Sequence, residues 1–124
     1  IAPASLTAVY AVNTLHVAHD LGFTLAEVRR TLRPGGALIV SECVRPYPRY
    51  AVYTEFVFNL IQIFRSPRLD GAHRPNGGFL TPPQWKGAIE AAGFADTRFV
   101  PDVMRIHRAV SDFFVAAIGA IRRD

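Results

Sequence analysis

The stretch that decides the fold is LRPGGALIVSE, residues 32–42. Residues 37–41 are apolar up to a final serine and show no alternation with polar residues, which is typical of a strand covered on both faces of a sheet. Pro34, Gly35 and Gly36 favour a turn before it, because proline lacks an amide hydrogen and glycine adopts conformations that end helices. We therefore expect a turn that leads into a buried parallel strand.

The residues before this turn predict a helix and a further strand. Thr24 has the character of an N-cap, and Glu27 follows three residues later as in a capping box. An apolar stripe that starts at Leu25 indicates a short helix ending at Arg33. Residues 6–12 are apolar and partly β-branched, which predicts a buried strand. Strand, helix, turn and strand form a βαβ unit, whose crossover is expected to be right-handed.

Residues 46–83 differ from the strands around them and form a predicted insert. Aromatic residues crowd this insert, and residues 50–64 have the pattern of one amphipathic helix. RSPRLDGAHRPNGG, residues 65–78, is polar and rich in proline and glycine, so it is predicted to be a loop. Long loops in compact domains often carry function.

The last part of the chain predicts one helix and two strands. Thr81 is expected to cap a helix that begins at Pro82 and ends at Gly93. Residues 94–100 and 112–121 then read as strands. The connection between them is too short for a parallel crossover, so we expect these two strands to be antiparallel.

Composition narrows the function classes. A length of 124 residues leaves room for one domain, and the formal charge of +4 comes largely from arginines scattered along the chain. Nucleic-acid binding is not expected, because it usually requires clustered basic residues with interleaved aromatic residues. Cys43 is the only cysteine, which favours a reducing, cytoplasmic location. No apolar run approaches the roughly 18 residues of a membrane span, no signal peptide opens the chain, and we expect no bound metal. The first residue, Ile1, suggests a chain cut from something longer.

Three stretches, AVNTLHVAHDL, LRPGGALIVSE and GGFLTPPQWKGAIEAAGFADTRF, together resemble the C-terminal half of class I S-adenosylmethionine-dependent methyltransferases. The resemblance covers nearly the whole chain. It implies an α/β fold, namely the C-terminal half of a Rossmann-like sheet with strands four to seven, the last one antiparallel, and a helical insert after strand five. Residues 1–124 would then be one partial domain, and residues 46–83 would be a possible substrate lid.

Parts of that family's cofactor site are not found in the sequence. The Gly-x-Gly turn between the first strand and first helix is absent, and so is the acidic residue that ends the second strand and would hold the ribose. We therefore expect S-adenosylmethionine to be the cofactor of the full-length protein and not to bind this chain alone. Asn13 and Thr14, at the end of the strand over 6–12, are the residues expected to contact it.

The resemblance also suggests a catalytic pair. A histidine in N-x-L-H after one strand, with a glutamate ending the next, resembles the C-methyltransferase domains of polyketide synthases, which methylate the carbon between two carbonyls of a β-ketoacyl thioester. His16 would be the general base, because a neutral imidazole titrates near the working pH. Glu42 would orient the imidazole and stabilise its charged form. Structural alternatives are that His16 packs in a loop and that Glu42 is a solvated strand end or pairs with Arg45.

The aromatic insert offers candidate substrate contacts. Tyr53, Phe56, Asn59 and Phe79 are expected to line an apolar acyl or aromatic pocket. The same rings could equally form the core of a helical cap.

Other conspicuous residues have plainer interpretations. His19 is expected to help start the following helix, and Cys43 to act as a small buried hydrophobe. His73 and His107 have no supporting spacing and are treated as surface residues. Trp85 is expected to pack its helix onto the sheet.

Three functions remain open on the sequence. The favoured one is carbon methylation of a β-ketoacyl or polyketide-like substrate, and the enzymatic alternative is O-methylation of a small hydroxyl or phenol. The third is a non-catalytic half-domain that acts by association. Residues 6–12 would then expose an unpaired apolar edge, for which we expect a homodimer.

Overall fold

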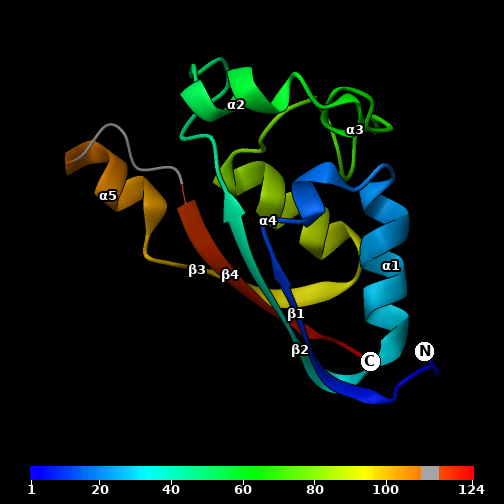
Figure 1. Cartoon of the computed structure of the whole chain (residues 1–124). Coiled ribbons are helices and arrows are strands. Elements are labelled where there is room, and N and C mark those ends of the chain that lie inside the picture. The colour runs from blue at the N-terminus through cyan, green and yellow to red at the C-terminus, as the bar shows by residue number, and fades with distance from the viewer. Residues whose placement is uncertain (110–114) are drawn as a thin grey trace.

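The computed structural model describes residues 1–109 and 115–124 and has alternating strands and helices (Figure 1). Its elements in chain order are β1 (Leu6–Val12), the short 3₁₀ helix η1 (Leu15–Val17), α1 (Leu21–Thr31), β2 (Leu32–Cys43), α2 (Tyr53–Phe58), α3 (Gln62–Arg65), α4 (Pro82–Ala91), β3 (Phe94–Val100), α5 (Val103–Ala109) and β4 (Val115–Arg122). The α/β class predicted from the sequence is confirmed.

The strands form one mixed sheet in the order β1-β2-β4-β3. β1 and β2 are parallel, with Val9 opposite Leu38, so the βαβ unit is confirmed. β4 is antiparallel to both β2 and β3, which confirms the antiparallel final pair. The connection between these two strands contains α5, a helix that the sequence did not predict. The first three residues of the strand predicted over 112–121 lie outside the described residues.

Helix α1 begins earlier than predicted, and its N-cap is Asp20 rather than Thr24. The Asp20 carboxylate accepts a hydrogen bond from the Phe23 N–H at 2.8 Å, while the Thr24 hydroxyl donates back to the Asp20 carbonyl. Glu27 does not close a capping box, because it pairs with Arg30 one turn further on at 3.0 Å. The helix then ends at Thr31, short of the predicted Arg33.

The predicted turn at Pro34–Gly36 is an irregularity inside β2. Between the pairs Leu6–Leu32 and Ala8–Ala37, β2 advances further than β1, so the extra residues bulge out of the ladder. Gly35 has a φ of +73°, which favours glycine. A Cβ at Gly36 would lie 2.8 Å from the Arg33 carbonyl oxygen, so this position also requires glycine.

The single helix predicted over 50–64 is wrong, because the structure has two short helices, α2 and α3, with extended Ile61 between them. In one continuous helix, Phe58 and Phe64 would point about 120° apart. The break lets both rings pack in the same cluster, with Val52 and Phe79. The predicted start of α4 is confirmed, since Thr81 and Gln84 form a reciprocal capping box.

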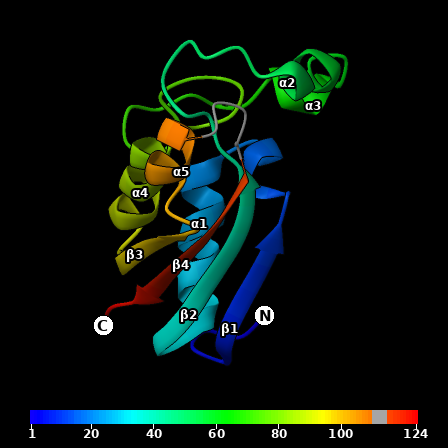
Figure 2. The same cartoon turned by 90° about the vertical axis from the view of Figure 1, so that its left-hand side faces the viewer.

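Helices α1 and α4 pack on one face of the sheet (Figure 2). The core between these layers consists mainly of Leu21, Leu25, Leu38, Val40, Trp85, Ile89 and Ile118. Trp85 is fully buried there, as predicted.

The alternate side chains of the strands point to the opposite face of the sheet, which we call the open face. Its large apolar residues are exposed in the described part of the chain: Tyr10, Val12, Ile39, Val100, Val115 and Ile121. Tyr10 is 68% exposed and Ile39 is 41% exposed, so the prediction that the strands over 6–12 and 37–41 are buried is wrong for this face, because α1 and α4 pack on the other one. Among the described residues, no helix is long and apolar enough to cross a membrane.

Candidate functional site

The ends of β1 and β2 bring a histidine and a glutamate together. Because the two strands are parallel, their carboxyl ends meet at one edge of the sheet, where open α/β sheets bind ligands. His16 lies in η1 just after β1, and Glu42 lies near the end of β2. The His16 Nδ1 atom lies 2.7 Å from the Glu42 Oε2 atom, and the two residues are only 2% and 1% exposed. The alternative in which Glu42 is a solvated strand end does not hold.

The second oxygen of Glu42 holds the turn that carries the histidine. Glu42 Oε1 accepts hydrogen bonds from the backbone N–H groups of Thr14 at 2.8 Å and Leu15 at 2.6 Å, and a longer one from His16 at 3.3 Å. One buried carboxylate therefore fixes both the backbone of η1 and the orientation of the His16 ring.

Three phenylalanines surround the His16 ring, and we call them the aromatic cage: Phe58, Phe64 and Phe79. Their ring centroids lie 5.5, 6.0 and 5.4 Å from that of His16. Of these three rings, the sequence predicts only Phe79 as a substrate contact. The signal for Phe58 and Phe64 was the crowding of aromatic residues in the insert, which does not tell which rings turn inward.

The other candidate substrate residues lie on the exposed side of α2 or beside it. Tyr53 and Phe56 are 82% and 71% exposed, and the ring contacts of His16 among the described residues are with the aromatic cage. Asn59 lines a polar hollow of about 360 Å³ together with Arg45, Glu55 and Arg65. The structure thus brings Phe79 to His16, and places Asn59 at a neighbouring opening.

The candidate cofactor residues lie at the end of β1. Asn13 is exposed, has a φ of +49° and donates its backbone N–H to the Ser41 carbonyl at 2.7 Å. Its side-chain oxygen lies 3.9 Å from the Cys43 sulfur. Thr14 is exposed as well, and its backbone N–H donates a hydrogen bond to the Glu42 carboxylate. Both side chains therefore remain available to a ligand at the strand ends.

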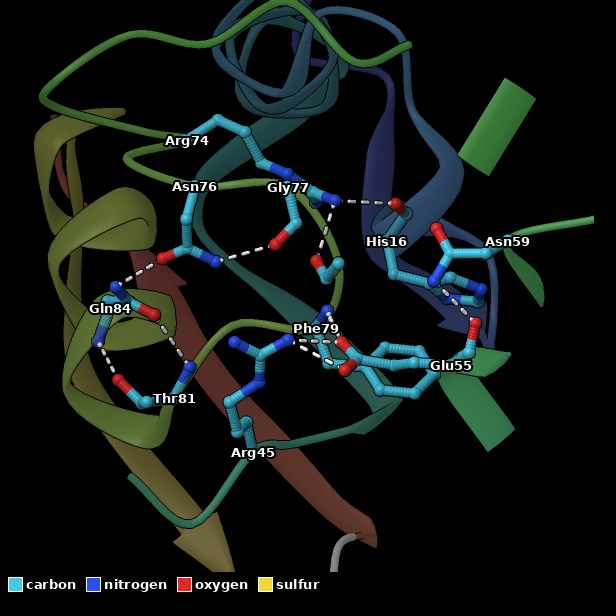
Figure 3. A network of polar contacts seen from close by, with 11 residues as sticks. His16, Arg45, Glu55, Asn59, Arg74, Asn76, Gly77, Phe79, Thr81 and Gln84 are labelled. Atoms are coloured by element: carbon cyan, nitrogen blue, oxygen red, sulfur yellow. Dashed lines mark hydrogen bonds and ion pairs between the residues drawn. The ribbon is translucent and has the colours of Figure 1, made fainter. Parts of the chain in front are cut away.

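The loop after α3 is tied to this site by polar contacts (Figure 3). Arg74 donates to the His16 carbonyl at 3.0 Å and to the Gly78 carbonyl at 2.8 Å. Next to it, Glu55 pairs with Arg45 at 2.6 Å and accepts the Phe79 N–H. The suggested pairing of Glu42 with Arg45 is thus replaced by these two contacts. Asn76 continues the network to Gln84 at the start of α4.

The remaining histidines and the cysteine have structural surroundings. His19 Nδ1 lies 3.0 Å from the Ser66 carbonyl, while Asp20 is the residue that starts α1. His73 is half-buried and pairs with Asp70 at 3.1 Å, so its assignment to the surface was wrong. Burial raises the pKa of the half-buried Cys43 thiol, and the neighbouring Glu42 charge raises it further. The side chain of His107 lies outside the described residues.

Comparison with known proteins agrees with this architecture. A family model described as a methyltransferase domain matches residues 1–40. The chain is 34% identical over 98 residues to the highly reducing polyketide synthase NEC1 of Pyricularia oryzae, an alignment that covers 79% of this chain and 3% of that protein. The crystal structure of the CurJ carbon methyltransferase superimposes with a TM-score of 0.78 at 26% identity, covering 98% of this chain and 31% of that one.

This is a methyltransferase fold, most similar to those of polyketide synthases. The trans-methyltransferase CalH, solved in complex with SAH, is a further example, with a TM-score of 0.72 at 25% identity over 97% of this chain and 31% of that one. The methyltransferase fold described here thus spans about a third of each of these two solved chains and 3% of this curated relative. The family resemblance seen in the sequence is confirmed.

In this methyltransferase fold, no group of three or more His, Cys, Asp or Glu residues within the described ranges is placed to hold a metal ion. The site contains the buried imidazole of His16, which contacts the Glu42 carboxylate and is surrounded by the aromatic cage. The exposed polar side chains at the end of β1 lie beside it. An imidazole whose second nitrogen is fixed by a carboxylate is an arrangement suited to proton transfer.

Proposed function

We propose that this chain belongs to an S-adenosylmethionine-dependent C-methyltransferase, with His16 as the general base and Glu42 as the residue that orients it. The favoured substrate is a β-ketoacyl or polyketide-like thioester, whose carbon between two carbonyls is acidic. The observation that carries the proposal is the 2.7 Å contact between His16 Nδ1 and Glu42 Oε2, both buried at the ends of parallel strands. The similarity to polyketide-synthase methyltransferases supports the substrate class.

The base must remove a proton from the substrate carbon before that carbon can accept a methyl group. With the proton of a neutral imidazole on Nδ1 and directed at Glu42, the lone pair of Nε2 is free to take the substrate proton. Glu42 then lies beside the imidazolium and stabilises its charge, as the third group does in other base-dependent sites. The step moves one proton from carbon to Nε2 and leaves the electron pair delocalised over the two carbonyl groups.

The cofactor would supply an electrophilic methyl group held on a sulfonium. Asn13 and Thr14 would hold its amino-acid end, since their side chains are exposed where β1 ends. The SAH complex of the similar CalH fold supports this choice of cofactor. Methyl transfer itself depends mainly on alignment of the carbon with the methyl group, so the residues at the strand ends act by positioning.

Substrate access requires the aromatic cage to open, because His16 is 2% exposed. Two of the three cage rings come from α2 and α3, which are short helices without a side-chain N-cap. Short helices are marginal by themselves, so movement of this segment has a small cost. The insert over 46–83 would then act as a substrate lid, with exposed Tyr53 and Phe56 facing incoming ligand.

The test is a His16→Ala substitution in the full-length protein, assayed for methyl incorporation into a β-ketoacyl thioester. We expect a loss of about 100-fold or more in kcat/KM, the usual contribution of a general base. His19→Ala is the matched control, because His19 is a neighbouring exposed histidine with a loop carbonyl as its partner. Activity of the His16 variant within a few-fold of the parent would remove it from the mechanism. Methylation of a phenol in place of the thioester would favour the O-methyltransferase alternative.

The open face favours a second candidate, a non-catalytic half-domain that associates through its sheet. β1 lies at one edge of the sheet, and its residues Tyr10 and Val12 are exposed. Unpaired edges and exposed apolar faces promote pairing between chains. On this proposal the 124-residue chain forms a homodimer through β1, and a monomer in sedimentation at tens of micromolar would contradict it.

A further inference from the structure

Arg74 is a fully buried arginine in the polar loop between α3 and α4. Its backbone is fixed by two hydrogen bonds with Asp70, whose carboxylate also accepts the His73 N–H at 2.7 Å. A loop arginine would normally extend into solvent, because removing a guanidinium from water is costly. The position of Arg74 therefore indicates a specific role inside the protein.

The contacts of Arg74 point to the candidate base. One terminal nitrogen, Nη2, donates both to the His16 carbonyl at 3.0 Å and to the Gly78 carbonyl at 2.8 Å (Figure 3). The Nε and Nη1 atoms are buried and have no hydrogen-bond partner among the described residues. Hydrogen bonding alone therefore does not account for the burial of this side chain, because most of its donors are unused.

The charges around Arg74 explain why this guanidinium is buried. Burial lowers the pKa of Arg74, and the carboxylates of Glu42 and Glu55 oppose that effect by favouring the charged guanidinium. Glu55 has its own cationic partner in Arg45 at 2.6 Å. That leaves the positive charge of Arg74 to balance the negative charge of Glu42, and the cluster is neutral when His16 carries no charge.

We propose that Arg74 is a positioning residue for His16, holding the backbone of residue 16 and keeping the imidazole uncharged by balancing Glu42. The inference rests on the proposed role of His16 as a base. In general a carboxylate beside an imidazole favours the protonated ring, which cannot accept a proton from a substrate. A second cation in the cluster disfavours that extra proton. Arg74 thus preserves the form of His16 that the reaction needs.

The groups that face His16 are few among the described residues. β2 contributes Glu42, α2 contributes Phe58 and the nearby Glu55, and the loop contributes Arg74 and Phe79. From α3 comes Phe64, followed in sequence by the exposed Arg65. Cys43, next to Glu42, remains a thiol because burial raises its pKa. Arg74 is therefore the cation that contacts the residue carrying the imidazole.

The experiment compares Arg74→Gln with Arg74→Lys in the full-length protein, through the pH profile of kcat/KM. Glutamine keeps an N–H donor for the carbonyls and removes the charge, whereas lysine keeps the charge. The acid limb of this profile is the range in which kcat/KM falls because the base becomes protonated. For Arg74→Gln we expect this limb to move to higher pH by roughly one unit. Activity at neutral pH should then be about tenfold lower and should recover at higher pH. Arg74→Lys should leave the limb near its original position. An equal loss in both variants at every pH, with no displacement of the limb, would overturn the inference.

Two additional measurements separate the possible failures. If Arg74→Gln does not fold, Glu55→Gln takes its place, and removing this negative charge should move the acid limb to lower pH; an unmoved limb would overturn the inference. If His16→Ala remains active, the proposed function fails, and NMR titration of the His16 ring then decides the case for Arg74. An earlier appearance of the imidazolium on lowering the pH in Arg74→Gln than in the parent supports the charge balance, and coincident titrations refute it.

Discussion

Replacing Glu42 with glutamine tests the site most sharply, because it changes one atom and removes one charge. The three backbone N–H groups of residues 14–16 need an acceptor at the Oε1 position, so the glutamine oxygen is expected to remain there. Its NH₂ group then takes the place of Oε2, 2.7 Å from His16 Nδ1. Two N–H donors cannot bond to each other, so Nδ1 must lose its proton and the neutral ring must carry it on Nε2.

The predicted effect on the reaction is large and the effect on the fold is moderate. A ring with its proton on Nε2 has no lone pair for the substrate, so we expect kcat/KM to fall by about 10² to 10⁴-fold, the range of general-base contributions. Stability should fall by about 3 kcal/mol at most, taking about 1 kcal/mol for each of three hydrogen bonds that change from a charged to a neutral acceptor. Turning the amide over would cost more, since its NH₂ would then face the backbone N–H donors.

The assay is methyl transfer by the full-length protein to a β-ketoacyl thioester, with thermal unfolding measured in parallel. Glu90→Gln is the matched control, because Glu90 is an exposed glutamate on α4 that pairs only with Lys86 one turn away in the described structure. It should leave both activity and melting temperature unchanged. A Glu42→Gln protein that is folded and within a few-fold of parental activity would refute the tautomer argument and the role of Glu42 as the residue that orients His16.

Three further predictions concern the residues around the site. Gly78→Ala should destabilise the protein by about 2 kcal/mol or more in chemical denaturation, because Gly78 has a φ of +73° and a Cβ there would collide with the Glu55–Arg45 pair. Gly77→Ala is the control, because there is open space around Gly77. Equal stability of the two variants would contradict the prediction. Cys43 should react with iodoacetamide at pH 8 more slowly in the folded protein than in urea, since burial raises its pKa; equal rates would show that the thiol is not shielded. The Phe23 N–H, followed by Arg68, lowers the pKa of Asp20, so its stabilising effect is present above the pKa of an unfolded aspartate and is lost as the pH falls through the lower folded value. Asp20→Asn should therefore show a smaller fall in melting temperature between pH 5 and pH 2 than the parent, and an unchanged fall would count against this origin.

The sequence predicts well the strands and the helix that place His16 and Glu42, because these elements depend on local patterns. An apolar strand, a helix and a second uninterrupted apolar strand after Pro-Gly-Gly together indicate a parallel βαβ unit, and the carboxyl ends of its parallel strands lie at the same edge of the sheet. The proximity of His16 and Glu42 follows from that rule. The start of α1 was misassigned because Asp20 and Thr24 are both good N-caps. The ion pair between Asp20 and Arg68, far apart in sequence, is not visible in local spacing.

The surroundings of the imidazole were harder to predict. The choice among the aromatic residues of the insert depends on the break between α2 and α3, which turns Phe58 and Phe64 inward. Arg74 was not selected, because an arginine in a loop rich in proline and glycine has every local sign of a solvent-exposed residue. Its burial depends on a hydrogen bond to the carbonyl of residue 16 and on the charges of Glu42 and Glu55, all distant in the chain.

The bulge at Gly35 and Gly36 has a consequence for recognising related sites in other sequences. It sets which residue of β2 lies opposite each residue of β1, and Glu42 follows six residues after Gly36, about 20 Å along the strand. Because neighbouring strand residues face opposite sides, a deletion of one residue in the bulge would bring Cys43 to the place of the carboxylate. A search that asks only for the histidine and the glutamate would still accept such a chain. The number of residues in the bulge at the start of β2 is thus part of the signature of this site.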